Sequence, residues 1–526
     1  MKKVNKLIAS LLVGSMVLSL AACGNPEGTG NTDVASSEVT SNEASSEAVE
    51  STEATPAEVV KPESIKVMWD GTVFKEGDNY AEEFYAALDE ALGMKIEWVR
   101  PDHSSYAEQV GIAFNDANTL ADVVILPANY YASYASQGNL WNMTDAWLNS
   151  ETANSGRLTD AAAQVIEGWY VPGPDGQEGI YGMYPARGNG CITYVKAAWA
   201  TAAGYTEDTL PTTWAEYQDF LLAMKEATGK APVLAAGLVT QEAPYTNYLP
   251  EFYQDAYPEF YQNADGQWVD GFSEQAMIDA LDRLAWGYSN GVLEASILEG
   301  PSTSDVRNKF YDDTTGIFTY WAGTWAYNIK SNLEKKDVDS EVWNLKPIAE
   351  LGTYIERLSP MIAITSSCEN PEGVFKYFID TMLDGGEVQM LWQYGVENVH
   401  YQWNEDGATI TGLPTQSSAG SEKESLTSKN LFEANLKLAN FAEVDPYVPA
   451  DAVIDESFEL FNATSSQAVE INSSEVYRSY SADLWTIKNQ LIADVTQGKM
   501  TGAEAIAQYN EECGDIVAAI LDSFNN

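Results

Sequence analysis

Four aromatic residues stand within ten positions in the stretch TYWAGTWAYN, residues 319–328. Tyr and Trp rings can form flat platforms on which the apolar face of a ligand stacks, and they lose few rotamers in doing so. The same residue types also fill cores, and with 15 Trp and 29 Tyr most of them in this chain must be buried. The stretch is therefore either a piece of core or a binding platform, and the elements around it must decide.

Groups that could support catalysis are few. The chain has two histidines, His103 and His400, and it contains neither a G-x-S-x-G elbow nor a P-loop, so it is not expected to hydrolyse ATP. The 78 acidic residues leave open a carboxylate pair for glycoside hydrolysis, but no pair stands out. A binding site needs only a cleft, aromatic platforms and a few polar groups, so we expect a binding protein and not an enzyme.

The charge balance excludes some partners. With 28 Lys and Arg against 78 Asp and Glu, the formal net charge is -50, which argues against nucleic-acid binding and against charge-driven docking on anionic lipid. Solubility through self-repulsion is the simpler interpretation of this charge. The length of 526 residues is too great for one hydrophobic core and predicts two or more lobes.

The N-terminus reads MKKVNKLIASLLVGSMVLSLAAC. Lysines precede an apolar run that is too short for a membrane span, which predicts a signal peptide over residues 1–22. The ending LAAC resembles the lipobox of bacterial lipoproteins, and the resemblance implies that Cys23 carries lipid; an ordinary signal peptide with a chance cysteine is the alternative. Residues 23–63 then form a lipidated cysteine and a disordered acidic Ser/Glu tether. We expect a lipid-anchored chain that is otherwise soluble.

The folded part is expected to begin at Ser64 with a strand, SIKVMW. NYAEEFYAALDEALG predicts a helix with Phe84, Leu88 and Leu92 on one face and Gly93 as its C-cap. MKIEWV predicts a strand, SSYAEQVGIAFNDA a helix, and ADVVILPA a strand of the buried parallel type. This alternation predicts an α/β lobe with a mainly parallel sheet.

Several later segments also carry local signals. LPTTWAEYQDFLLAMK opens with a capping box of Thr213 and Glu216, and its inner face is expected to hold Leu221, Leu222 and Met224. NADGQW and NEDGATI predict Asp-Gly hairpin turns and lack the ligand series of a calcium loop, so no metal and no cofactor are expected. The C-terminal segment 484–521 predicts two helices separated at Gly498.

The remaining cysteines are Cys191, Cys368 and Cys513. Three cysteines allow at most one disulfide, and they lie too far apart in sequence for metal-ligand spacing. We expect them to be small buried hydrophobic residues.

Five blocks in order resemble the extracellular solute-binding proteins of ABC importers, family 1, and among these the larger oligosaccharide-binding members. The blocks are ADVVILPANYYASYASQGNLWNMTDAWL, DGQEGIYGMYPARGNGCITYVKAAWATAAGYTEDTLPTTWAEYQDFLLAMK, DGQWVDGFSEQAMIDALDRLAWGYSNGVL, NKFYDDTTGIFTYWAGTWAYNI and ENPEGVFKYFIDTMLDGGEVQMLWQYGVENVHYQW. The resemblance implies two α/β lobes of the type II periplasmic-binding-protein kind, with a hinge and a ligand cleft between them. By block order, lobe one covers 64–187 and 362–425, and lobe two covers 188–361 and 426–526.

The resemblance also implies a function. The protein would capture an oligosaccharide by lobe closure and deliver it, as a monomer, to an ABC permease that is powered by separate ATPase subunits. Its place would be the outer face of the cell membrane, and the lipobox with an acidic tether fits a Gram-positive surface. A peptide or polyamine receptor on the same fold and a lipid-anchored extracellular glycosidase are the alternatives.

Sugars explain the residue types expected at such a site, since a pyranose offers an apolar face to Trp and Tyr and a rim of hydroxyls to polar side chains. In open α/β lobes the cleft lies at the carboxyl ends of the strands. The candidates are Trp69 and Asp70 after the first strand, Asn129 and Tyr130 after ADVVILPA, Arg187 and Asn189 near the first crossing, Glu242 and Tyr245 in a loop that resembles the family's stacking-Tyr loop, Trp321, Trp325 and Tyr327 around GIFTYW, and His400 and Tyr401 in GVENVHY.

One of these candidates departs from the family pattern, and two have alternative roles. The family often has a carboxylate where this chain has Asn129, so no sugar identity is transferred. Arg187 would meet a uronic-acid carboxylate or form a structural salt bridge, and His400 would be either a ligand contact or a satisfied loop histidine.

In the strand that contains the start of TYWAGTWAYN, successive side chains are expected to point to opposite faces. Phe318 and Tyr320 share one face of the strand, while Ile317, Thr319 and Trp321 share the other, and at least one set should be core. The glycine at 323 allows the backbone to turn. The threonine at 324 can cap the following helix, which places the tryptophan at 325 on its first turn, where the cleft is expected.

Overall fold

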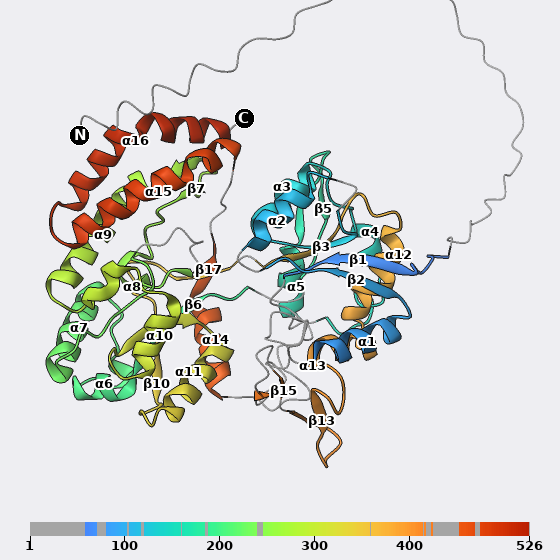
Figure 1. Cartoon of the computed structure of the whole chain (residues 1–526), viewed down its shortest axis with the longest axis horizontal. Helices are drawn as coiled ribbons and strands as arrows, with labels where there is room; N and C mark the ends of the chain where they lie inside the picture. Colours follow the sequence, from blue (N-terminus) through green and yellow to red (C-terminus); the bar gives the residue numbers. More distant parts are fainter. Residues whose placement is uncertain are drawn as a thin grey trace, which may run out of the picture. The chain divides into compact units, whose positions relative to one another are not determined.

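The computed structural model describes residues 58–70, 80–102, 105–116, 120–158, 160–184, 188–238, 246–357, 359–413, 415–416, 422–423, 452–468 and 474–524 (Figure 1). The signal peptide, the lipidated Cys23 and the tether as far as residue 57 lie outside the described residues, so they stay predictions. Within the described ranges, no helix combines the length and the apolar character needed to cross a membrane.

The first sheet has the strand order β12-β3-β1-β2. β1 (Ser64–Met68) lies parallel to β2 (Lys95–Val99) and to β3 (Val123–Leu126), while β12 (Met361–Ile364) joins antiparallel to β3 from far along the chain. Every residue of β3 is buried, as the apolar sequence predicts. The expected order of strand, helix, strand, helix and strand is confirmed.

The helix α1 (Ala81–Leu92) shows how this order arises from the sequence. Phe84, Leu88 and Leu92 are all buried, and Gly93 ends the helix in the left-handed conformation with φ of 56°. A residue with a Cβ is strained there, so glycine is the suitable C-cap. The helix therefore begins and ends close to where the pattern predicts.

A first hydrophobic core surrounds this sheet and draws on residues 65–184 and 361–392. Its other elements are α2 (Tyr106–Ala113), α3 (Ala128–Ser136), α4 (Thr144–Leu148), α5 (Asp160–Glu167), β4 (Tyr170–Pro172), β5 (Glu178–Ile180), α12 (Pro371–Val374) and α13 (Glu387–Tyr394). Two short hairpins follow, β13 (Tyr401–Trp403) with β14 (Ile410–Gly412) and β15 (Thr415–Gln416) with β16 (Glu422–Lys423).

The second sheet has the order β10-β6-β9, and all of its pairs are antiparallel. β6 (Cys191–Lys196) lies between β9 (Ile317–Trp321) and β10 (Val342–Leu345), and all six of its residues are buried. The other elements are α6 (Ala197–Ala202), α7 (Trp214–Thr228), α8 (Pro250–Tyr253), β7 (Phe260–Gln262), β8 (Trp268–Asp270), α9 (Gln275–Ser289), α10 (Thr303–Tyr311), α11 (Thr324–Lys335), β11 (Tyr354–Glu356), α14 (Ala452–Thr464), β17 (Ser465–Gln467), α15 (Glu475–Thr496) and α16 (Gly502–Phe524).

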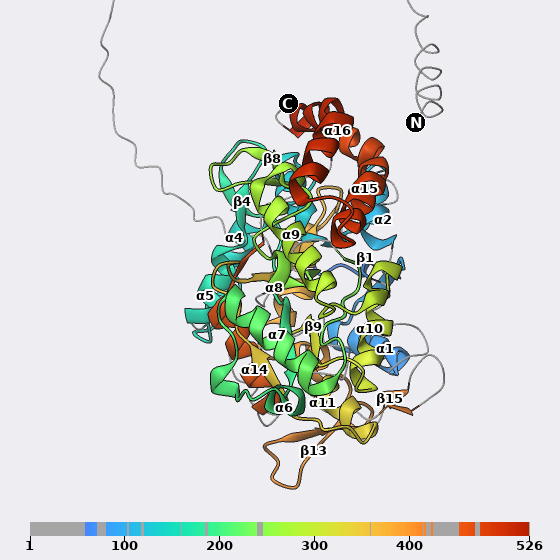
Figure 2. The ribbon, with the colours of Figure 1, turned by 90° about the vertical axis from the view of Figure 1, so that its left-hand side faces the viewer.

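A second core is built from residues 192–354 together with the C-terminal segment 461–520. The predicted C-terminal helices are present as α15 and α16, with Gly498 in the left-handed conformation between them. Both helices pack against α9, which can be followed in Figure 1 and Figure 2. The two predicted Asp-Gly hairpins are also confirmed as β7–β8 and β13–β14.

Two local predictions are wrong by one position. The capping box of α7 is present, but Leu222 is 39% exposed, because the buried set on this helix is Tyr217, Phe220, Leu221 and Met224. Those positions follow i, i+3, i+4 and i+7, and the next residue is rotated away from the core by the helical repeat. In α11 the N-cap is Gly323 and not Thr324, which is instead the first helical residue.

The three cysteines of the described residues are free, with Cys191 and Cys513 buried and Cys368 half-buried. Burial raises the pKa of the Cys368 thiol to about 12, which keeps it protonated at neutral pH. No group of three or more His, Cys, Asp or Glu side chains that could hold a metal ion occurs in the part of the chain that the structure describes.

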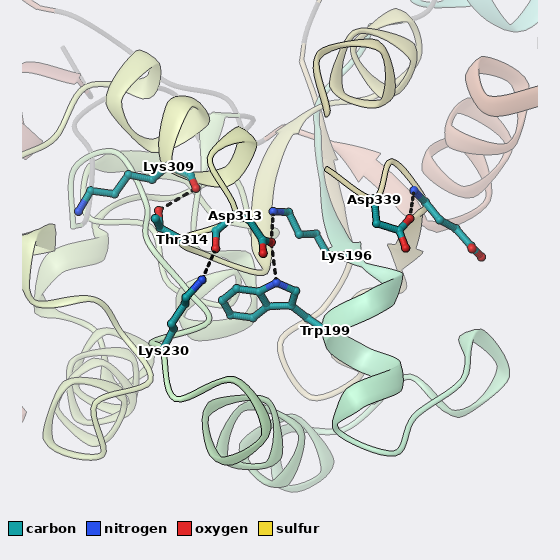
Figure 3. A network of polar contacts seen from close by, with 8 residues as sticks. Lys196, Trp199, Lys230, Lys309, Asp313, Thr314 and Asp339 are labelled. Carbon is teal, nitrogen blue, oxygen red and sulfur yellow. Dashed lines mark hydrogen bonds and ion pairs between the residues drawn. The ribbon is translucent and has the colours of Figure 1, made fainter. Parts of the chain in front are cut away.

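An ion pair between a buried lysine and a half-exposed aspartate connects β6 to the turn before β9 (Figure 3). The Lys196 ammonium lies 2.7 Å from Asp313 Oδ1, which also accepts a hydrogen bond of 2.8 Å from the Trp199 indole. Lys230 donates to the Asp313 carbonyl at 2.6 Å. Burial alone would raise the pKa of Asp313, but the hydrogen bonds from Lys196 and Trp199 and the positive charge of Lys196 hold it below its usual value.

We expect Asp313→Asn to lower the free energy of unfolding by about 1–2 kcal/mol at pH 7, because it leaves the Lys196 ammonium buried without its counter-charge. Half-exposure of Asp313 keeps the effect small, and Asn tolerates the positive φ of 56° at this position. Since the pKa of Asp313 is lowered on folding, its contribution is present above its unfolded pKa and is lost at lower pH. Denaturant midpoints at pH 7 and pH 3 measure this, with the exposed Asp339→Asn as the control; equal midpoints for Asp313→Asn and wild type at pH 7 would contradict it.

A buried carboxyl group, that of Glu251, lies beside β6 of the second sheet. Glu251 is buried, and its Oε1 and the hydroxyl of Tyr217 lack hydrogen-bond partners among the described residues. Burial raises the pKa of Glu251 to about 7, and a hydrogen bond with Thr193 opposes this only in part. The folded chain therefore keeps a proton on Glu251 at a pH where the unfolded chain has lost it.

The carboxyl of Glu251 should make the protein less stable as pH rises from about 4.5 to about 7, and the loss should be complete above that pH. Glutamine cannot ionise, so Glu251→Gln should raise the free energy of unfolding by about 2 kcal/mol at pH 8 and change it little at pH 4.5. Melting temperatures at the two pH values test this. The exposed Glu299→Gln serves as the control, and a Glu251→Gln variant with the pH profile of wild type would refute the prediction.

Candidate functional site

Three chain segments meet where the chain passes between the two cores. Gly188 donates its N–H to Glu356 Oε1 at 3.0 Å, and Arg357 donates its backbone N–H to the Asn189 carbonyl at 2.9 Å. β17 lies parallel to β11 and forms the third segment. A Cβ added at Gly188 would lie 1.7 Å from the Arg357 carbonyl oxygen, so only glycine permits this close approach.

Trp321 and Arg357 form a stacked pair beside these segments. The guanidinium carbon of Arg357 lies 5.1 Å from the centroid of the Trp321 ring. Asn189 is brought to the same place, since its Nδ2 donates to the Ala322 carbonyl at 3.1 Å and its Oδ1 accepts from Gly190 at 2.8 Å. We call Trp321 and Arg357 the Arg357 pair.

The other face of β9 carries a second group, formed by Tyr248, Arg307, Tyr320 and Trp325, which we call the Arg307 cluster. The Tyr320 ring meets Trp325 edge-on at 4.7 Å and stacks on Tyr248 at 6.3 Å. The Arg307 guanidinium lies 5.3 Å from the Trp325 ring and 5.9 Å from the Tyr320 ring. Burial raises the pKa of Tyr320, and the charge of Arg307 opposes this shift.

The position of Trp325 follows from local structure. Gly323 has φ of 78° and would place a Cβ 2.2 Å from the Phe458 ring, so this glycine makes the sharp turn from β9 into α11. Trp325 thereby lies on the first turn of α11, as predicted, and it is half-buried like Tyr327. The predicted division of the strand is also confirmed, since Phe318 stacks on Tyr320 at 5.2 Å while Thr319 faces Thr193.

The candidates from the first core lie differently. Trp69 is 2% exposed and stacks on Trp392 at 5.6 Å, so its ring is a core group in this structure. Asp70 is half-buried at the carboxyl end of β1. Burial raises the pKa of Tyr106, and the negative charge of Asp70 raises it further. The role of Trp69 as a stacking platform stays a prediction that requires its neighbours to move.

Tyr130 lies on α3 and is half-buried. Its ring is stacked on that of Tyr134 at 5.2 Å with an interplanar angle of 5°. Burial raises the pKa of Tyr130, against the opposing charge of Arg478. Asn129 belongs to the same helix, and its side chain lies outside what is described.

His400 and Tyr401 are buried in or beside a small third core of Tyr394, Tyr401 and Ile410. His400 is 0% exposed, and its Nδ1 accepts a hydrogen bond of 2.9 Å from the Val396 N–H. These contacts match the satisfied loop histidine that was the alternative interpretation. Their roles as ligand contacts stay predictions, as do those of Arg187, Glu242 and Tyr245, which lie outside the described residues.

Sequence reasoning missed Arg307, Arg357, Tyr248 and the part played by Tyr320. Arg357 is 36 positions after Trp321 and follows a three-residue strand, so no short motif joins them. Tyr248 could have been found, because it stands only three positions after the candidate Tyr245. Together the two groups offer half-buried aromatic rings and cationic guanidinium groups at one strand end, which suits a ligand with apolar faces and oxygen acceptors.

No family model matches the sequence, and no curated protein matches it. Solved structures do match over most of the chain. The sugar-binding protein MalE from Xanthomonas citri has a TM-score of 0.55 at 15% identity and covers 88% of this chain and 99% of its own. The N-glycan transport solute-binding protein NgtS from Streptococcus pneumoniae has a TM-score of 0.58 at 15% identity and covers 89% and 98%.

An extracellular solute-binding protein family 1 member from Alicyclobacillus acidocaldarius has a TM-score of 0.53 at 16% identity, with coverage of 88% and 100%. At a sequence identity of 15–16%, structural similarity shows a shared fold, and this similarity covers 88–89% of the chain. The chain therefore has the two-lobed α/β fold of the extracellular solute-binding proteins.

Proposed function

We propose that this protein is a receptor for an oligosaccharide, which it binds around the end of strand β9. The observation that carries the proposal is the burial pattern of that strand: Ile317, Phe318 and Thr319 are buried, whereas Tyr320 and Trp321 are half-buried, as is Trp325 just beyond. The strand thus passes from core into a set of accessible rings at its carboxyl end. The same fold in proteins named for sugar and N-glycan binding supports the proposal.

The chemistry of the two groups suits a sugar. Each ring offers a flat apolar surface to the C–H face of a pyranose, and the guanidinium groups of Arg307 and Arg357 are donors to its oxygens. Two or three stacked sugar units with a few desolvated hydrogen bonds would give a dissociation constant in the micromolar range, which corresponds to a binding free energy of about -8 kcal/mol. Several rings along one edge fit a chain of sugar units better than a single sugar.

The receptor would work by closing two lobes on its ligand and docking on an ABC permease with separate ATPase subunits. We place lobe one at 64–187 with 362–425 and lobe two at 188–361 with 426–526, and the membership of the two cores supports this division. We also propose anchoring through Cys23 at the outer face of the membrane, a monomeric state, and ligand contacts from Asp70, Tyr130, Asn189 and Tyr327 at the lobe edges.

Titration calorimetry of the mature chain against a panel of oligosaccharides tests the proposal. We expect heat with at least one carbohydrate and none with oligopeptides or spermidine. Heat with a peptide or a polyamine and with no carbohydrate would overturn it in favour of another receptor on the same fold.

The same samples separate a receptor from a glycosidase. Thin-layer chromatography after long incubation should recover the bound oligosaccharide intact. Release of shorter sugars would contradict a purely binding role.

A further inference from the structure

The Arg357 side chain has an unusual environment. Its Nε atom is buried and has no hydrogen-bond partner, and its guanidinium makes no ion pair with any described residue. Among the described residues, its backbone N–H donates to the Asn189 carbonyl and its guanidinium lies over the Trp321 ring. A half-buried cation with unused donors is costly unless something else supplies the acceptors.

Other buried cations in the described part of the chain have carboxylate partners. Lys196 is paired with Asp313, Arg283 with Asp255, and Lys488 lies 4.0 Å from Glu259. The sequence contains 78 acidic residues for 28 Lys and Arg, so a carboxylate partner would be easy to provide. Its absence at Arg357 therefore separates this position from the structural ion pairs.

Arg307 repeats the same feature on the other face of β9. Its guanidinium lies over Trp325, donates to Ser304 Oγ at 3.3 Å, and forms no ion pair among the residues that the structure describes. Two arginines without carboxylate partners thus flank the end of the strand to which we assign sugar binding. A neutral sugar would satisfy some of their donors but would leave their charge uncompensated.

We propose that the oligosaccharide carries a carboxylate, as a uronic acid does, and that Arg357 receives this carboxylate while Trp321 holds the guanidinium plane in place. This inference rests on the proposed function and narrows its substrate class. The planar fork of arginine matches a carboxylate with two parallel N–H···O bonds, a geometry that lysine cannot reproduce. The net charge of -50 repels anions at long range, so the selectivity must come from contact at the guanidinium, where salt screens less.

Titration calorimetry compares pairs of sugars in which one member carries carboxylates that its neutral partner lacks. The probe pairs are trigalacturonate and its methyl ester, trimannuronate and mannotriose, and glucuronate-substituted xylotriose and its methyl ester. We expect the charged member of at least one pair to bind at least about thirtyfold more tightly than its neutral partner. Equal or tighter binding of the neutral member in every pair that binds would overturn the inference and leave the oligosaccharide receptor standing, whereas binding of peptides alone would overturn both.

Variants of Arg357 test whether this residue is the one that binds the carboxylate. Arg357→Gln should weaken binding of the charged sugar at least about thirtyfold and leave a neutral sugar within about threefold, and Arg357→Lys should restore the affinity only in part. Arg100→Gln is the matched control, because its guanidinium lies over the Tyr85 ring at the same distance of 5.1 Å and its loss changes the net charge equally. Thermal denaturation of each variant verifies folding, and a folded Arg357→Gln variant with wild-type affinity for the charged sugar would refute the assignment.

Discussion

Replacing Trp325 with alanine should weaken oligosaccharide binding by about a hundredfold. A tryptophan buries roughly 150–250 Å², and one face of the ring accounts for about 100 Å², which at about 25 cal/mol per Å² corresponds to roughly 2.5 kcal/mol. Trp325 is half-buried on the first turn of α11, where its ring lies nearly perpendicular to that of Tyr320, and we expect the sugar to stack on the part of the ring that stays exposed. Titration calorimetry with the sugar that binds wild type measures the loss.

Two further variants make this result specific. Trp325→Phe keeps an aromatic face and should retain most of the affinity. Trp343→Ala removes another half-buried tryptophan, on β10, whose indole donates to Glu341, and it should leave binding unchanged. A folded Trp325→Ala variant that binds with wild-type affinity would show that Trp325 belongs to the core and not to the site.

Lys488→Met should lower the free energy of unfolding by about 3–5 kcal/mol, which is the usual cost of breaking a buried charge pair from one side. Lys488 is 0% exposed, donates to the Pro258 carbonyl at 2.7 Å and lies 4.0 Å from Glu259. Four rings surround its ammonium at 5.3–5.7 Å, those of Phe260, Phe272, Trp485 and Tyr509. Methionine fills the same space but leaves the Glu259 carboxylate buried without its cation.

Melting temperature and denaturant midpoint measure this loss. Lys336→Met is the matched control, because its ion pair with Asp312 is 2.7 Å long but both side chains are 52% exposed, and its effect should be within about 1 kcal/mol. The double variant Lys488→Met with Glu259→Gln removes both charges and should recover part of the loss. Equal stabilities of Lys488→Met and Lys336→Met would contradict the assigned role of the buried pair.

Local structure was largely predictable from the sequence. The alternation of strands and helices from Ser64 to Leu126, the glycine cap at Gly93 and the capping box at Thr213 all rest on periodicity and hydrogen-bonding rules that act within a few residues. The errors at Leu222 and Thr324 are of one position, because a helix rotates by about 100° per residue and its cap depends on backbone angles that the side chains do not reveal.

Tertiary partners were much less predictable. No local pattern in the sequence distinguishes Lys488 from the other lysines, yet the fold places it among four rings that come from residues 260–272 and 485–509. Arg357 likewise became a candidate only because the fold places its guanidinium over the ring of Trp321, which is distant in the sequence. Strand-end reasoning selected Trp69, Trp321 and Trp325 as candidates, and their roles stay predictions. It gave no sign that the Trp69 ring stacks on Trp392, and the sequence likewise did not show that His400 Nδ1 accepts from the Val396 N–H.

Fluorine NMR of the protein labelled with 5-fluorotryptophan tests the central claim most directly. The Trp325 signal is identified by its loss in Trp325→Phe, and the signal of the buried Trp147 in the first core by its loss in Trp147→Phe. On titration with the oligosaccharide that releases heat, we predict that the Trp325 signal shifts in proportion to saturation while the Trp147 signal stays in place. A Trp325 signal that does not move at saturation, or a spectrum that no carbohydrate changes, would contradict sugar binding at the end of β9.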